Sequence, residues 1–177
     1  EFKIFTSPKS FIDVINLVEQ IASFLNVEER GLKLKEKLIS DQNRINEMKK
    51  NLIDSPSIAF FMNPSTTGNY SAAGSGTRAD YLIDFIGGIN VFKDSFIRYN
   101  KVNKETILDY NPDIIFVAST GSGKNSKSVF LDDPTFKNIS AVKNNKIIFL
   151  DLGYHLTFGS VFGESAILAL SLVLADE

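Results

Sequence analysis

Three short apolar runs constrain the fold of this chain more than any other feature. They are Ile58–Met62, Ile114–Ala118 and Lys146–Leu150. Each run is nearly continuous in apolar residues, which is typical of strands that are buried on both faces of a parallel sheet. Helical spacing recurs between the runs. This alternation predicts an α/β fold, a three-layer sandwich with a mostly parallel central sheet.

The first third of the chain is predominantly helical in its spacing. Phe2–Phe5 is a short strand candidate that Ser7-Pro8 ends. Apolar residues then recur every three or four positions from Phe11 to about Asn26, which predicts an amphipathic helix. A second, long and charged helix is predicted over Glu28–Leu52, and an apolar helix over Gly163–Leu174 closes the chain.

Composition excludes several classes of function. The formal net charge is −2, so no basic field favours nucleic acid. The absence of cysteine excludes disulfides, thiolate metal sites and cysteine nucleophiles. No apolar run approaches the roughly 18 residues that span a bilayer. The 177 residues suffice for one domain with a substantial core.

A small-residue loop at Ala72–Gly76 leads into a helix that Thr77 can cap through its hydroxyl. The helix ends at Gly87-Gly88, because glycine adopts left-handed conformations at little cost. A flexible loop followed by a capped helix holds the ligand in many proteins. The alternative is that this segment is an ordinary loop and helix with no role in binding. Ligands of parallel sheets bind at loops beyond the carboxyl ends of the strands, here Asn63–Gly76, Ser119–Ser128 and Asp151–Phe162.

Four segments occur in an order that carries a family resemblance. They are T-x-A-D-x-L-I with G-G-x-N over 77–90, Lys104–Leu108 followed by Asn111–Val117, Lys146–Asp151, and the Y-x-L-x-F-G loop at Tyr154–Gly159. The set resembles the C-terminal lobe of substrate-binding proteins of ABC importers for haem, iron-siderophores and cobalamin. The last loop is most similar to that of the haem-binding members.

The resemblance implies the helical-backbone type of metal receptor, in which two α/β lobes are joined by a long helix. That helix is either Glu28–Leu52 or its predecessor, Lys9–Leu25. Residues 1–52 are then the strand and helices that link the lobes, and residues 53–177 are the C-terminal lobe. The N-terminal lobe is absent from this chain.

The resemblance also implies a function. The chain is expected to be the C-terminal part of a non-enzymatic protein, periplasmic or a cell-surface lipoprotein, that captures haem and delivers it to the permease and ATPase subunits of an importer. Iron-siderophore or cobalamin binding is the alternative, and no catalytic cofactor is implied. An alternative of another class is an α/β enzyme or nucleotide-binding module that uses Ser119–Ser128, although this loop lacks the first glycine and the final Ser/Thr of a phosphate loop.

Two residues are candidate ligands of haem iron. Tyr70 is expected in the loop after the first buried strand, where a phenolate oxygen suits ferric iron. His155 is the only histidine and offers an imidazole nitrogen. The matching family position is commonly apolar, so we expect Tyr70 to matter more than His155. The alternatives are a tyrosine that packs on the surface and a partly exposed loop histidine.

Four further residues are expected to serve binding or docking. Tyr154 and Phe158 offer a flat apolar wall for a porphyrin. Arg78 is a candidate to replace an arginine that relatives often carry after the F-G pair, where this chain has Ser160-Val161; the favoured alternative is an exposed arginine in the first turn of its helix. The resemblance assigns Glu105 to permease docking. A lobe that exposes its inter-lobe face is also expected to form homo-oligomers.

Overall fold

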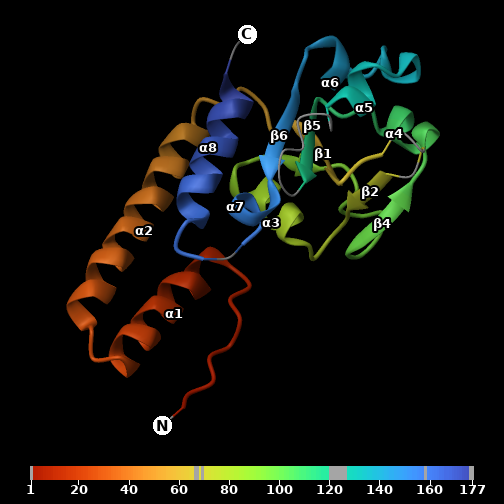
Figure 1. The fold of residues 1–177 in the computed structure, drawn as a ribbon. Coiled ribbons are helices and arrows are strands. Elements are labelled where there is room, and N and C mark those ends of the chain that lie inside the picture. Colours follow the sequence, from red (N-terminus) through yellow and green to blue (C-terminus); the bar gives the residue numbers. More distant parts are fainter. Residues whose placement is uncertain (1, 66–67, 69, 120–126, 158, 176–177) are drawn as a thin grey trace.

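A mixed β-sheet forms the middle layer of the structure (Figure 1). The computed structural model describes residues 2–65, 68, 70–119, 127–157 and 159–175. Strands β1 (Ser57–Met62), β5 (Ile114–Ser119) and β6 (Ile147–Asp151) pair in parallel, β1 with β5 and β5 with β6. The three predicted strands are therefore confirmed, and they lie in one sheet.

The remaining strands make the sheet mixed. In the described part of the chain the strand order is β4-β2-β1-β5-β6, with β3 (Ile89–Asn90) paired to β1 in parallel. Strand β2 (Tyr70–Ala73) runs antiparallel to both β1 and β4 (Tyr99–Val102). The predicted loop Asn63–Gly76 thus contains a strand, because the backbone of Tyr70–Ala73 finds pairing partners on both sides.

Helices cover both faces of the sheet, as the three-layer prediction requires (Figure 1). One face carries α1 (Phe11–Phe24), α2 (Glu28–Lys49), α3 (Arg78–Phe85), α7 (Leu152–His155) and α8 (Phe162–Leu174). The other face carries α4 (Lys104–Tyr110), α5 (Ser128–Leu131), the 3₁₀ turn η1 (Pro134–Phe136) and α6 (Ser140–Lys143).

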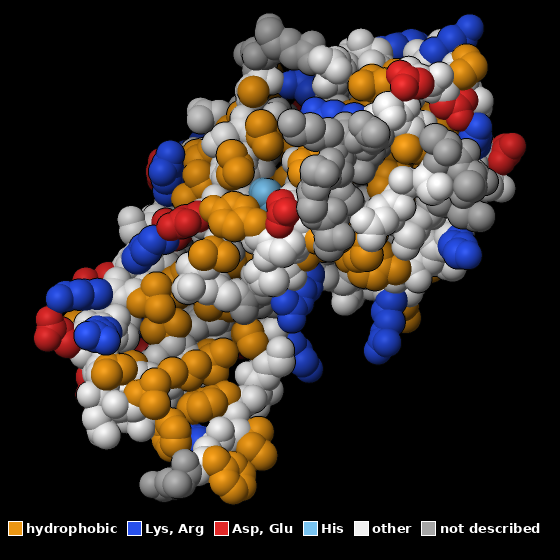
Figure 2. Space-filling view, viewed as in Figure 1, with side chains coloured by type: hydrophobic (Ala, Val, Ile, Leu, Met, Phe, Trp, Pro, Cys, Tyr) orange, Lys and Arg blue, Asp and Glu red, His pale blue; other side chains and the backbone are white. Residues whose placement is uncertain are grey.

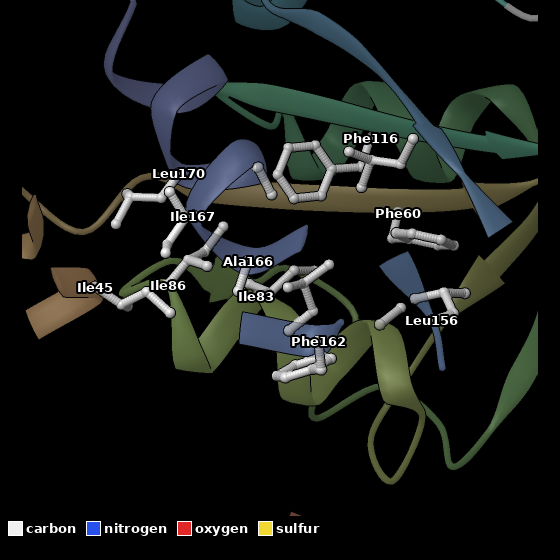
Figure 3. Packing of buried hydrophobic residues seen from close by; sticks show 14 of the residues in the cluster. Ile45, Phe60, Ile83, Ile86, Phe116, Leu156, Phe162, Ala166, Ile167 and Leu170 are labelled. Carbon is white, nitrogen blue, oxygen red and sulfur yellow. The ribbon is translucent and has the colours of Figure 1, made fainter. Parts of the chain in front are cut away.

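The core consists of two clusters, one on each face of the sheet. Because side chains alternate along a strand, Phe60 of β1 enters the first cluster and Phe61 enters the second. Figure 3 shows the first cluster, in which Phe60 and Phe116 face Phe162 and Ala166 of α8. Full burial of such side chains stabilises the fold by about 1.5–3 kcal/mol each.

The predicted capped helix is confirmed. The Thr77 hydroxyl accepts a hydrogen bond from the backbone N–H of Asp80 at 3.0 Å. After α3 the chain reverses at Gly87, whose φ of +91° lies in the left-handed region. A further polar contact fixes this unit, since the Asn90 amide donates to the Ala73 carbonyl and to Asp80.

The predicted strand Phe2–Phe5 is wrong. These residues have no strand partner, and Phe2 and Ile4 are 88 % and 86 % exposed. A strand requires neighbours for its N–H and C=O groups, and the sequence pattern alone does not supply them. Phe5 instead packs its ring against that of Phe24 on α1, 5.9 Å between centroids.

Apolar side chains remain exposed over the α1–α2 pair (Figure 2). They include Ile12, Ile21 and Leu25 of the α1 segment and Leu32 of α2. A groove of about 360 Å³ lined mainly by apolar residues lies between the two helices. Association of copies of this chain stays a prediction.

Among the described residues, no helix has the length and apolar character needed to cross a membrane.

Replacing Gly31 by valine tests the contact between α1 and α2. A Cβ at Gly31 would lie 2.3 Å from the Cβ of Ala22, so any side chain forces the helices apart. We expect the free energy of unfolding to fall by about 1–3 kcal/mol, measured by urea denaturation. Gly159→Val is the control, since a Cβ there meets no described atom within 4 Å. Equal stability of the two variants would contradict the close packing.

Candidate functional site

The carboxyl ends of the parallel strands meet at one edge of the sheet. The register pairs Met62 of β1 with Ala118 of β5, and Ala118 with Leu150 of β6. The short helix α7 follows immediately after β6. Polar and aromatic side chains carried by α7 are therefore held at the sheet edge where ligands of α/β folds bind.

Asp151 organises the α7 turn, which was predicted as a loop. Its carboxylate accepts a hydrogen bond from the backbone N–H of Tyr154 at 2.9 Å. Its carbonyl oxygen lies 3.1 Å from Nδ1 of His155. Because a carbonyl can only accept, Nδ1 is the protonated nitrogen, and Nε2 carries the free lone pair.

His155 is buried and its second nitrogen is unpartnered. The residue is 4 % exposed, and Nε2 makes no hydrogen bond within the structure as described. Burial lowers the pKa of His155, while the hydrogen bond to Asp151 opposes that shift. The ring is therefore neutral at pH 7. A neutral imidazole with an unpaired Nε2 is the form that ligates metal ions.

Tyr154 packs edge-on against the His155 ring, with 5.1 Å between centroids and an interplanar angle of 85°. Its hydroxyl points to Glu164 of α8, at 3.5 Å from Oε2. Burial, and next the Glu164 charge, raise the pKa of the Tyr154 phenol. The phenol is therefore neutral at pH 7, and the ring offers an apolar edge beside the imidazole.

Arg78 joins α3 to the α7 turn. Its Nη1 donates a hydrogen bond to the Leu156 carbonyl at 3.1 Å, one residue beyond His155. The guanidinium also lies close enough to Tyr99 to lower the pKa of that phenol, although burial raises it more. The structure therefore brings three predicted site residues together, namely Arg78, Tyr154 and His155.

Arg78 also lines a hollow of about 550 Å³ between Ser7–Lys9 and the start of α3. Lys9 and Lys93 add positive charge to its wall, and Asp80 and Asp84 add negative charge. A volume of this size is typical of small-molecule sites. The permanently charged guanidinium is the group in it best suited to pair with a carboxylate of a ligand.

Tyr70 does not lie in a loop, and that prediction is wrong. It is the first residue of β2 and is 1 % exposed, its ring enclosed by Phe61, Phe130 and Phe136. The β1–β2 register does place it at the predicted sheet edge, since Met62 pairs with Ser71. Its ring, however, enters the second core cluster, whereas Leu156 of the α7 segment packs into the first. Tyr70 and the α7 segment thus pack against opposite faces of the sheet.

The other predicted site residues divide as follows. Phe158 and residues 120–126 of the Ser119–Ser128 loop lie outside the described residues. Glu105 is exposed in the first turn of α4, which Asn103 caps through its side chain. Beside it, Lys104 pairs with Asp133, and this pairing lowers the pKa of Asp133 to about 2. The neighbouring cation is therefore neutralised, and Glu105 presents its own charge to solvent.

Sequence reasoning missed two contributors to this region. Tyr99 of β4 lies close enough to Arg78 for the guanidinium charge to act on its phenol, and the polar middle of this strand is not revealed by the apolar pattern. Glu164 contacts Tyr154 from α8. The sequence could have indicated that Glu164 lies in the first turn of a helix, because acidic residues are favoured there. It could not have indicated that Glu164 contacts Tyr154.

Solved structures share this fold. The periplasmic heme-binding protein BhuT, in complex with two hemes, matches with a TM-score of 0.83 at 21% identity, over 98% of this chain and 67% of that one. The periplasmic heme-binding protein HutB of Vibrio cholerae matches with a TM-score of 0.79 at 23% identity, over 97% of this chain and 66% of that one. These likenesses concern the fold alone.

Sequence relatives point in the same direction. The Fe(3+)-citrate-binding protein YfmC of Bacillus subtilis is 26% identical over 142 residues, 80% of this chain and 44% of the relative. The high-affinity heme uptake system protein IsdE of Staphylococcus aureus is 26% identical over 138 residues, 76% of this chain and 47% of the relative. The chain thus spans about half the length of these curated relatives. A family model described as periplasmic binding protein matches residues 1–152. The chain therefore belongs to the periplasmic binding protein family, whose members are non-enzymatic ligand carriers of ABC transport.

Proposed function

We propose that this chain is the C-terminal part of a binding protein that captures haem outside the membrane and delivers it to an ABC permease. Residues 1–52 would link this lobe to an N-terminal lobe, and the protein would be periplasmic or a cell-surface lipoprotein. The family and the haem-binding proteins among the relatives support the proposal. The ligand is cargo rather than a catalytic cofactor.

The observation that carries the proposal is the unpartnered Nε2 of His155. A buried polar atom without a hydrogen bond costs about 1–3 kcal/mol, so its retention calls for a partner that the described residues do not supply. Iron is a partner that accepts the lone pair of a neutral imidazole. We therefore assign the axial ligand to His155 rather than to Tyr70, whose ring is occupied in the core.

The neighbours of His155 suit the rest of a porphyrin. Tyr154 supplies an aromatic edge beside the imidazole. Arg78 is held next to Leu156 and carries a permanent positive charge that can pair with a propionate. Ferric citrate is the second candidate, because a ferric citrate binder is as similar in sequence as the haem protein. A citrate complex would depend on Arg78 and need no imidazole.

Haem titration of the complete protein tests the assignment. We expect His155→Ala to shift the Soret band and to weaken haem binding by roughly 10–100-fold or more, the loss typical of a disturbed metal site. Tyr70→Phe is the matched control and should leave spectrum and affinity unchanged, since its ring stays packed among Phe61, Phe130 and Phe136. The reverse pattern would make Tyr70 the ligand.

The same titration with ferric citrate separates the two cargoes. If citrate binds and haem does not, and His155→Ala has no effect, the haem proposal fails. Arg78→Met should weaken either ligand, because it removes the charge that pairs with a carboxylate while retaining an apolar stem. Arg98→Met, at another exposed arginine of the described chain, is the control for loss of positive charge.

Glu105→Gln tests docking to the permease. The substitution removes an exposed charge at the first turn of α4 without disturbing a described ion pair. We expect haem uptake to fall several-fold while haem affinity is unchanged, because an interfacial charge acts on association with the partner. Asp109→Asn, an exposed acid on the same helix, is the control. Equal uptake by both variants would remove Glu105 from the docking surface.

A further inference from the structure

Lys37 links α2 to the start of α8. Its Nζ lies 2.7 Å from Oε1 of Glu164 on α8 and 3.0 Å from Oδ2 of Asp41 on its own helix. The hydrogen bond to Glu164 raises the pKa of Lys37, and the same contact lowers the pKa of Glu164. Both groups are therefore charged at neutral pH, and Lys37 holds one oxygen of the Glu164 carboxylate.

The second oxygen of that carboxylate faces the candidate site. Oε2 of Glu164 lies 3.5 Å from the Tyr154 hydroxyl, and the Tyr154 ring meets the His155 ring edge-on. Glu164 thus stands between the cation on α2 and the aromatic pair on α7. A carboxylate that bridges two donors is restrained more than one with a single partner.

The backbone fixes the distance that the bridge spans. A Cβ at Gly163 would lie 2.6 Å from the Cβ of Asp41, so α8 and α2 approach as closely as glycine allows. The residues on either side of this contact, Lys37 and Glu164, are therefore presented to each other by packed helices. Their side chains are 43 % and 45 % exposed, and an exposed pair contributes little to stability on its own.

We propose that Lys37 is a positioning residue: by holding Glu164 it fixes the Tyr154 ring against His155, and it thereby couples helix α2 to the candidate ligand site. The consequence for ligand binding rests on the proposed function. The effect on the Tyr154–His155 ring pair does not rest on the proposed function, because each contact in the series from Lys37 to His155 is present without ligand.

The imidazole of His155 provides a direct readout, and its resonances are identified by their loss in His155→Ala. In the ligand-free complete protein, the NMR resonances of the His155 ring protons sense the ring current of Tyr154. Tyr154→Leu defines the value without that ring current. We expect Lys37→Met, which keeps a long apolar stem, to move these resonances toward the Tyr154→Leu value, and we expect Glu164→Gln to do the same.

Lys33→Met is the matched control. Lys33 is also on α2, but its Nζ pairs at 2.8 Å with Glu29 of the same helix. Its replacement should leave the His155 resonances unchanged. The proposal is overturned if Lys37→Met and Glu164→Gln also leave them unchanged, or if Lys33→Met moves them equally. Glu164→Gln decides the question alone if Lys37→Met does not fold.

Haem affinity then tests the coupling. We expect Lys37→Met to weaken haem binding about two- to fivefold, the scale of an exposed ion pair. In the Tyr154→Leu background the same substitution should have no further effect, since its action passes through Tyr154. If the parent protein binds no haem, the proposed function fails while the histidine resonances still decide the role of Lys37. Additive losses would contradict the coupling.

Discussion

The parallel pairing of β1 with β5 and of β5 with β6 is the constraint on which the rest of the structure depends. Strands buried on both faces need helices on both faces, which accounts for the two separate core clusters. The same pairing brings the carboxyl ends of the strands to one edge, so the segment after β6 is placed there by topology. Backbone pairing therefore places the α7 residues Tyr154 and His155 at this edge, independently of their side-chain contacts.

The fold was predictable where burial leaves a continuous apolar run or a capping residue marks an end. Ile58–Met62 shows the first signal and Thr77 the second. Strand β4 was not predictable in this way, because its middle residues, Asn100 and Lys101, are exposed and the strand is defined by pairing with β2. The prediction of a strand at Phe2–Phe5 was wrong for the opposite reason. These residues have an apolar pattern, but no strand pairs with them, so they remain irregular.

The candidate site was predictable in part. The segment after the last strand was identified from its position, and the structure places Arg78 beside it, while a role of Arg78 in binding stays a prediction. Strand β2, which begins at Tyr70, was not predicted. Without that strand, the sequence could not indicate which face of the sheet the Tyr70 ring would occupy. It also does not reveal that Asp151 caps α7 through its side chain while its carbonyl selects the His155 tautomer.

Tyr70 and His155 show why burial must be considered together with hydrogen bonding. Both are nearly inaccessible, and burial shifts the pKa of each toward the neutral form. For tyrosine the neutral form is a poor iron ligand, because the anionic oxygen is what binds ferric iron. For histidine the neutral form is the ligand. Under the proposed function, the same desolvation that makes Tyr70 a core residue would keep His155 in the form that binds iron. The hydrogen bond from Nδ1 to Asp151 would then leave Nε2 as the ligating nitrogen.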